Sequence, residues 1–343
     1  MKLGIISDLH IGRRMYRTDE NGYNKFEQIG YKALKQYTNI LLDENPDLII
    51  NGGDVFDISN PPILAMTKYQ EMQNRLKDIP TMTILGNHDF SFINRNNKCS
   101  ATQMANHTYF ADYEIKSVEF EDILYIMMPY IYDKDEKIYN MFKECKKIAE
   151  NSTNSKKILI THGITEKYHR ESFINDPFLI PDKLVSLFDL VIIGHIHTPF
   201  DYKQGKTLVI SPGAMIDYQA HEDRTGPIIL DTDTMKFHKI KVKTPHIIKK
   251  NATESNINDI LSNVTEDIYQ ITYKGDTSVI DNDIFLKAKE KTVNLVIDVT
   301  QPEELVETTM NSTLLGFDEW LKANYSDYVE VFRRAKEEIT GYD

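Results

Sequence analysis

The sequence contains few cysteines, no long apolar run and no excess of basic residues, and each absence excludes a class of protein. Only Cys99 and Cys145 occur among 343 residues, which excludes a disulfide scaffold and is typical of proteins in a reducing compartment. No run approaches the roughly 18 consecutive apolar residues of a membrane-spanning helix, and the first residues become acidic too early for a signal peptide. We therefore expect a cytoplasmic protein that makes no contact with a membrane.

The net charge of −12 argues against a strongly basic nucleic-acid binder, but the charge is unevenly distributed. Residues 236–250 contain six lysines and no carboxylate, whereas residues 301–343 contain ten acidic and four basic residues. Arg13, Arg14 and Arg17 form a second basic cluster. Such a local patch can steer an anion, although a solvated face is the simpler interpretation of each basic cluster taken by itself.

Short runs rich in Val, Ile and Leu alternate with helical patterns over the first 235 residues. Several runs are continuously apolar, which is typical of strands buried on both faces. Helical periodicity covers residues 23–44 and 65–77. This alternation predicts packed layers of helices and β-sheets, an α/β fold. The main predicted strands are 3–7, 47–51, 81–85, 124–128, 157–161, 190–193, 208–210 and 227–230.

The pattern changes towards the carboxyl end of the chain. Apolar residues alternate with lysine over 237–243, which predicts a half-exposed strand. Two helical and two strand-like segments follow between residues 256 and 299, and they predict a compact α+β module. Beyond Pro302 the chain is acidic, and residues 326–339 place apolar side chains on one helical face. We therefore predict a main domain at 1–240, a small α+β domain at 241–300 and an acidic helical tail at 301–343.

Polar side chains follow five of the predicted strands at the point where each strand ends. Each segment by itself could be an ordinary turn or a structural histidine. Because ligands in layered α/β proteins bind outside the carboxyl ends of the strands, the ordered set predicts a single site at one edge of the fold. The segments are Asp8-Leu9-His10, Gly52-Gly53-Asp54-Val55-Phe56-Asp57, Gly86-Asn87-His88-Asp89, Thr161-His162-Gly163 and Gly194-His195-Ile196-His197.

The residue types in this set indicate a metal site. Mixed carboxylate, imidazole and amide ligands suit manganese, iron or zinc, whereas magnesium prefers oxygen ligands and water. The ligands are too many for one ion, but two ions that share a bridging carboxylate would use them. Two metals about 3.5–4 Å apart can activate water and hold the oxygens of a phosphate. His88 follows Asn87 and, with an ordinary pKa of about 6.5, is suited to protonate a leaving oxygen.

The motif series resembles that of the calcineurin-like metallophosphoesterase superfamily. Within it, Asp8-Leu9-His10-Ile11-Gly12 and Gly53-Asp54-Val55-Phe56-Asp57 are similar to the SbcD branch, the bacterial relatives of the Mre-type double-strand-break repair nucleases. The resemblance covers roughly residues 1–235. It implies a four-layer α-β-β-α sandwich followed by a small α+β capping domain and a C-terminal helical segment.

The resemblance also implies roles for individual residues. Asp8, His10 and His197 would hold the first metal, Asp54 would bridge, and Asn87, His162 and His195 would hold the second, with manganese as the preferred ion. His88 would be the catalytic histidine. Asp57 would orient His88, as a carboxylate at this spacing does in related phosphatases. Some nucleases of the family have a histidine at that position, which leaves open whether Asp57 contacts the substrate instead.

The partners follow from the same resemblance. The protein would be an exonuclease and endonuclease subunit that acts on DNA with an SbcC-like SMC-type ATPase in repair, recombination or replication, in a bacterium or in the host of a bacteriophage. The capping domain would position DNA, and the C-terminal helix would bind the ATPase or pack on its own capping domain. Relatives of this kind form homodimers through core helices.

Two other functions are compatible with the sequence. An enzyme of the same fold could act on a small phosphodiester or a phosphoprotein, but the module after residue 245 and the lysines before it favour a polymeric substrate. A metal-free scaffold on this fold would have lost some ligands, whereas every expected ligand position is filled here.

Overall fold

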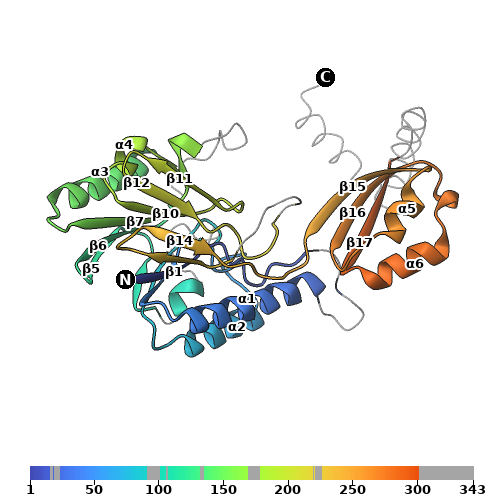
Figure 1. Cartoon of the computed structure of the whole chain (residues 1–343), viewed down its shortest axis with the longest axis horizontal. Helices are drawn as coiled ribbons and strands as arrows, with labels where there is room; N and C mark the ends of the chain where they lie inside the picture. Colours follow the sequence, from blue (N-terminus) through green and yellow to red (C-terminus); the bar gives the residue numbers. More distant parts are fainter. Residues whose placement is uncertain are drawn as a thin grey trace, which may run out of the picture. The chain divides into compact units, whose positions relative to one another are not determined.

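The computed structural model describes residues 1–15, 18, 24–90, 101–105, 107–131, 135–168, 178–218, 220 and 226–300, which form two compact units (Figure 1). Unit 1 extends from Met1 to Ile248, and unit 2 begins at Lys249. The predicted tail at 301–343 lies outside the described residues. Within the described ranges, no helix is both long enough and apolar enough to cross a membrane.

Unit 1 contains two six-stranded sheets. In the first, β1 to β4 are parallel neighbours in chain order, and β13 and β14 extend the sheet in antiparallel fashion beside β1. The predicted apolar runs at 3–7, 47–51, 81–85 and 227–230 are confirmed as strands of this sheet. In spatial order the strands are β14 (Lys236–Lys239), β13 (Ile228–Asp231), β1 (Lys2–Ile6), β2 (Leu48–Asn51), β3 (Thr81–Ile84) and β4 (Tyr109–Ala111).

The second sheet has a parallel centre with an antiparallel strand at each edge. The remaining predicted runs form four of its strands, whereas the two edge strands were not predicted, because their side chains are largely exposed and lack an apolar run. In spatial order the strands are β11 (Phe200–Gln204), β12 (Thr207–Ser211), β10 (Leu190–Gly194), β7 (Lys156–His162), β6 (Ile123–Met128) and β5 (Lys116–Phe120).

The two sheets pack face to face around a buried apolar core. Leu3 and Ile5 of β1 belong to this core together with Ile158 and Ile160 of β7. The side chains of a strand alternate between its faces, so the residue between Leu3 and Ile5 faces the other way: a β-carbon on Gly4 would lie 2.8 Å from Leu41 Cδ2. Each central strand is therefore apolar on both faces, which explains its continuous hydrophobic run.

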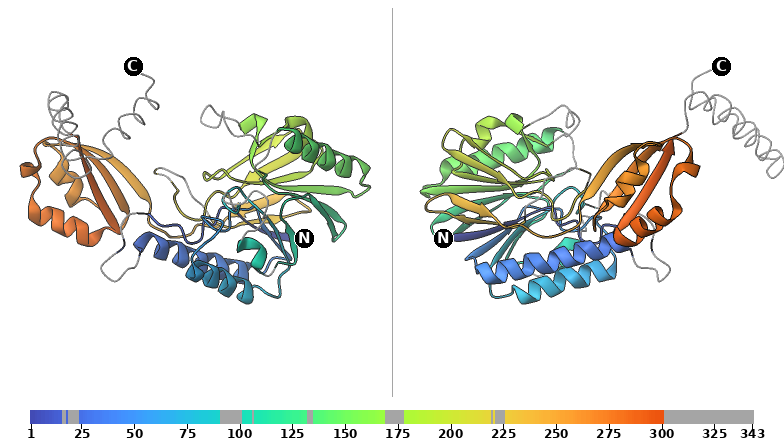
Figure 2. Two further views of the ribbon diagram at one scale, coloured as in Figure 1. Left: turned by 180° about the vertical axis from the view of Figure 1, so that it is seen from behind. Right: turned by 45° about the vertical axis from the view of Figure 1, so that its right-hand side comes forward.

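Helices cover the outer face of each sheet and complete four layers, as predicted. Side by side, α1 (Lys25–Glu44) and α2 (Ile63–Arg75) lie on the first sheet (Figure 2). The second sheet packs with α3 (Asp135–Asn151) and α4 (Asp182–Val185). Asn24 caps α1 because its side-chain oxygen accepts a hydrogen bond from Glu27 N at 3.1 Å. The short elements of unit 1 are β8 (Ile164–Thr165), β9 (Leu179–Ile180) and the 3-10 turns η1 (Ala101–Met104) and η2 (Glu166–Tyr168).

Unit 2 is an α+β module built on a three-stranded sheet in the order β15-β16-β17. The last two strands are parallel, so they need a crossover, which α6 provides. Ile271 and Tyr273 of β16 are buried beneath the helices. The elements are β15 (Ile247–Thr253), α5 (Ile257–Ser262), β16 (Ile268–Lys274), η4 (Thr277–Val279), α6 (Asn282–Lys291) and β17 (Asn294–Thr300).

Candidate metal centre

The loops that follow β1, β2 and β10 have strained backbones at their polar residues. Asp8, His10, Asp54 and His195 adopt positive φ angles of 50°, 43°, 51° and 90°. A residue with a β-carbon pays about 1–3 kcal/mol for such a conformation, which persists only where the surrounding structure imposes it. Strain of this kind collects at functional sites, and here it falls on four of the predicted metal ligands.

The first group of ligand atoms comes from Asp8, His10 and His197, which all lie within 4.8 Å of one another. His10 Nε2 and His197 Nε2 are only 3.1 Å apart. Burial lowers the pKa of His10 and outweighs the neighbouring carboxylates, so this imidazole is held neutral. Two imidazole nitrogens that face each other beside a carboxylate are suited to share a cation.

The second group brings together Asn87, His162 and His195. Asn87 Oδ1 lies 2.9 Å from His162 Nε2 and 2.7 Å from His195 Nδ1. His162 Nδ1 donates a hydrogen bond to Gly52 O at 2.8 Å, so a neutral His162 presents the lone pair of Nε2 to the site. Burial lowers the pKa of His162, but the negative charge of the nearby Asp54 prevails and raises it to about 9. A bound cation would displace that proton.

Asp54 lies between the two groups. Its Oδ1 accepts a hydrogen bond from His88 N at 2.8 Å, and its Oδ2 lies 3.3 Å from His162 Nε2 and 3.8 Å from His10 Nε2. Burial raises the pKa of Asp54, yet the positive charge of the nearby His162 holds it well below its usual value. Asp54 is 1% exposed, and Oδ2 has no hydrogen-bond partner among the described residues. This buried, ionised oxygen lies between two imidazoles without a hydrogen bond of its own, and it fits a carboxylate that bridges two cations.

The turn that presents Asn87 and His88 is closed by Asp89. Asp89 Oδ2 accepts a hydrogen bond from Gly86 N at 2.9 Å, and Oδ1 accepts one from Thr102 Oγ1 at 2.7 Å. Burial and the nearby charge of Asp54 raise the pKa of Asp89 to about 6. The hydrogen bond between the first and last residues of the Gly-Asn-His-Asp sequence thus closes the turn and holds the side chains of Asn87 and His88 at the site.

His88 and Asp57 are in contact, but through a different atom from the one that we predicted. His88 Nδ1 donates to the backbone carbonyl of Asp57 at 2.7 Å. The carboxylate of Asp57 lies instead 3.5 Å from His10 Nδ1 and 3.1 Å from Arg13 Nη1. Burial raises the pKa of Asp57, but the neighbouring His10 and the charge of Arg13 lower it overall. Because a carbonyl only accepts hydrogen bonds, Nδ1 of His88 is protonated, and Nε2 is left to exchange a proton.

Several residues around the site were not predicted from the sequence. Ser7 Oγ donates to Asp8 Oδ2, and the ring of Tyr130 stacks 5.9 Å from that of His195. Tyr218 lies 4.3 Å from the ring of His197. Neither tyrosine belongs to a motif, so local pattern held no signal for them.

The interpretation of the arginine cluster as a solvated face is wrong for Arg13. Its side chain is 13% exposed and lies between Asp57 and Tyr218. Arg14 fits the prediction better, because its side chain is 55% exposed, although it pairs with the buried Glu27 in the first turn of α1. Arg17 lies outside the described residues.

Close packing around Asp54 makes Gly86→Ala a sensitive test of the site. A β-carbon at Gly86 would lie 2.6 Å from His162 Cε1 and closer still to Asp54 Oδ1. We expect the variant to lose metal binding and about 1–3 kcal/mol of unfolding free energy, measured by metal analysis and urea denaturation. The control is Gly30→Ala within α1, where the nearest atom is 3.7 Å away and alanine should add about 0.5–1 kcal/mol. Full metal content in Gly86→Ala would contradict the packing argument.

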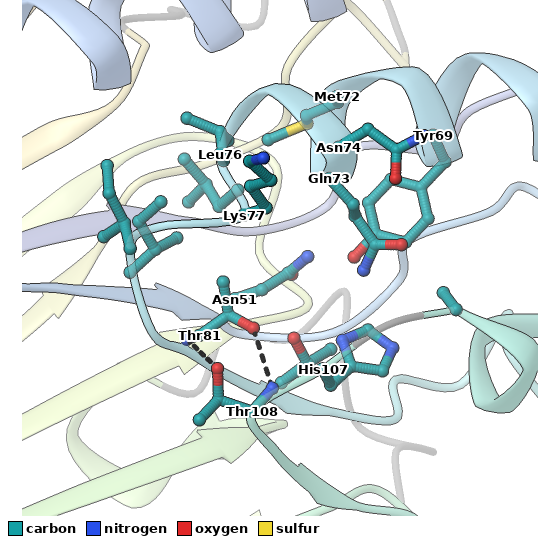
Figure 3. A pocket seen from close by; sticks show the side chains of 15 residues that line it. Asn51, Tyr69, Met72, Gln73, Asn74, Leu76, Lys77, Thr81, His107 and Thr108 are labelled. Carbon is teal, nitrogen blue, oxygen red and sulfur yellow. Dashed lines mark hydrogen bonds between the residues drawn. The ribbon is translucent and has the colours of Figure 1, made fainter.

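A separate cavity of about 340 Å³ lies between α2 and the ends of β2 and β3 (Figure 3). Asn51, Tyr69, Lys77 and His107 line it, and none of the predicted metal ligands does. Asn51 connects the cavity wall to the loop after β2 that contains Asp54, because its Oδ1 accepts a hydrogen bond from Gly53 N at 3.2 Å. The loop that holds Asp54 is therefore tied to a residue that lines this cavity.

A family model described as calcineurin-like phosphoesterase matches residues 1–199. This span includes β1 to β10 and every predicted metal ligand. The motifs and the family model thus point to the same part of the chain.

Similar proteins of known name come from archaea and bacteria. The DNA double-strand break repair protein Mre11 of Methanococcus maripaludis is 25% identical over 93% of this chain and 99% of its own length. The Mre11 protein of Thermoplasma acidophilum is 24% identical over 82% of each chain. A protein of Staphylococcus epidermidis that is named as a component of the nuclease SbcCD is 27% identical over 65% of this chain and 63% of its own length.

Proposed function

Since the chain belongs to the calcineurin-like phosphoesterase family, we propose that it is a two-metal nuclease that hydrolyses DNA phosphodiester bonds. The observation that supports DNA as the substrate is the extent of the similarity to the Methanococcus maripaludis protein named for double-strand break repair. That alignment covers 93% of the chain, whereas the match to the phosphoesterase family ends at residue 199. The similarity therefore continues beyond the hydrolytic domain into the segment that we predicted to position a polymer.

The proposed metal ligands are those predicted from the sequence. In this proposal Asp8, His10 and His197 hold one cation, Asn87, His162 and His195 hold the other, and Asp54 bridges. Mixed imidazole, carboxylate and amide donors suit manganese, iron or zinc, and manganese is the proposed ion because the resemblance to the SbcD branch implies it. When bound, the two cations supply Lewis acidity that activates water and holds the phosphate oxygens.

His88 is the proposed general acid. Its Nδ1 proton is held by the carbonyl of Asp57 at 2.7 Å. The protonated imidazole can therefore donate only from Nε2, and the fixed ring orientation determines where that proton goes. Asp57 orients His88 through its backbone in this proposal, while its carboxylate supports His10.

The lysines between residues 236 and 250 are the proposed phosphate contacts. Lys236 and Lys239 lie on β14, at the edge of the first sheet, and Lys249 and Lys250 lie on β15. Contacts to phosphate fix the position of a duplex without reading its sequence. We propose that the 241–300 domain positions the DNA and that an SbcC-like ATPase is the partner of the nuclease. We also propose that the protein is cytoplasmic and forms a homodimer.

A comparison of two substrates tests the DNA proposal. With Mn²⁺, we expect kcat/KM for end-labelled linear duplex to fall at least 100-fold between 50 and 200 mM salt, because each lysine–phosphate contact releases counterions. Hydrolysis of bis(p-nitrophenyl) phosphate should change little over the same range. Efficient turnover of the small diester without cleavage of duplex or single-stranded DNA would contradict the proposal and favour a small-molecule phosphodiesterase.

A further inference from the structure

Arg13 joins three loops beside the metal centre. Its Nη1 donates to Asp57 Oδ1 at 3.1 Å, and its Nη2 donates to the backbone carbonyl of Tyr218 at 3.3 Å. The guanidinium carbon also lies 3.2 Å from the centre of the Tyr218 ring. These contacts use the planar face and the fork of the guanidinium together, which lysine cannot reproduce.

The Asp57 oxygen that binds Arg13 also lies behind His10. Asp57 Oδ1 is 3.5 Å from His10 Nδ1, a buried nitrogen that makes no closer hydrogen bond to any described residue. The other ring nitrogen, Nε2, faces His197. Since the two nitrogens point in different directions, the carboxylate sits on the side of the imidazole away from the cation. A carboxylate in that place fixes the tautomer and the orientation of a metal-binding histidine.

Tyr218 supports the same two histidines from another direction. Its ring centre lies 4.9 Å from that of His10 and 4.3 Å from that of His197. Arg13 covers one face of this ring, so it holds Tyr218 as well as Asp57. Removing the guanidinium would release both supports of the first ligand group at once.

We propose that Arg13 is a positioning residue of the first metal site, which holds Asp57 and Tyr218 against His10 and His197 and thereby raises the affinity of that site for a divalent cation. The inference rests on the two-metal part of the proposed function and is independent of the substrate. Charge alone would have the opposite effect, because a cation near the site repels a bound metal. The direction of the change in affinity therefore distinguishes positioning from simple electrostatics.

Titration of the metal-free protein with Mn²⁺, followed by calorimetry and by electron paramagnetic resonance of free Mn²⁺, tests this inference. In Arg13→Gln we expect one of the two sites to bind Mn²⁺ about 10–100-fold more weakly, the range found when the outer support of a ligand is lost. Arg13→Lys should show a similar loss despite its retained charge. Arg75→Gln, which removes the same charge from an exposed position on α2, is the matched control and should bind normally.

Unchanged or tighter Mn²⁺ binding in folded Arg13→Gln would overturn the inference. If that variant does not fold, Arg13→Lys decides, because it keeps the charge and most of the volume. The double variant Arg13→Gln/Asp57→Asn provides a second measure: both residues act on His10 along one path, so its loss should be less than the product of the two single losses. A chain that shows these metal affinities but cleaves no DNA would refute the proposed substrate and leave the role of Arg13 standing.

Discussion

His88→Ala is expected to retain both cations and to lose about 10²–10⁴-fold in turnover of duplex DNA, the usual contribution of a general acid. The side chain of His88 donates to the carbonyl of Asp57, and only its backbone N–H contacts Asp54. Truncation therefore leaves the bridging carboxylate in place. Metal analysis and single-turnover cleavage of end-labelled duplex measure the two effects separately.

The leaving group provides the control for this prediction. The p-nitrophenolate of bis(p-nitrophenyl) phosphate departs without protonation, so the same variant should lose far less activity on that substrate. An equal loss on both substrates would assign His88 to substrate binding, and normal cleavage of DNA would show that the acid assignment is wrong.

Asp54→Asn is expected to abolish the paired metal centre and DNA cleavage together. The buried Oδ2 of Asp54 lies between the two ligand groups and has no other partner among the described residues. At a Mn²⁺ concentration of 100 times Kd, one bound ion stabilises the wild type by about 2.7 kcal/mol, which should raise Tm by roughly 5–11 °C for a domain of this size. We expect Asp54→Asn to lose most of this shift in differential scanning calorimetry and to bind at most one Mn²⁺.

Asp122→Asn is the matched control, because it makes the same change at an exposed turn with φ of 60°, a conformation that asparagine tolerates. It should keep the full Mn²⁺-dependent shift and normal cleavage. Two bound ions per chain in Asp54→Asn would contradict the bridging role.

The positions of the central strands could be predicted because they depend on the local sequence of apolar residues. The central strands are apolar on both faces, so each appears in the sequence as an unbroken run, as in 48–50 and 191–193. The edge strands β5 and β11 could not be found in this way, since most of their side chains are exposed or only partly buried and each strand has only five residues. Each of these edge strands forms by pairing with its neighbour, β12 or β6, and its own sequence lacks the apolar run that would predict it.

The convergence of the proposed ligands could be predicted for a related reason. Asp8, Asp54, Asn87 and His195 follow strands and His162 ends one, and the carboxyl ends of these strands meet at one edge, so the convergence is a property of the topology. The motifs do not determine which atom of a residue contacts which neighbour. The carbonyl of Asp57 holds His88 and its carboxylate faces His10, and the spacing of motif residues holds no information on that choice.

The sequence by itself determined the family, the layered α/β architecture and the types of donor at the candidate metal centre, because apolar periodicity and strand-end motifs are local properties of the chain. Only the tertiary structure decided that the largely covered side chain of Arg13 lies against the site. Its partners Asp57 and Tyr218 are 44 and 205 residues away along the chain. Whether a charged side chain is buried or solvated depends on which segments pack against it. Here those segments are distant in the sequence, and a local sequence pattern holds no information about them.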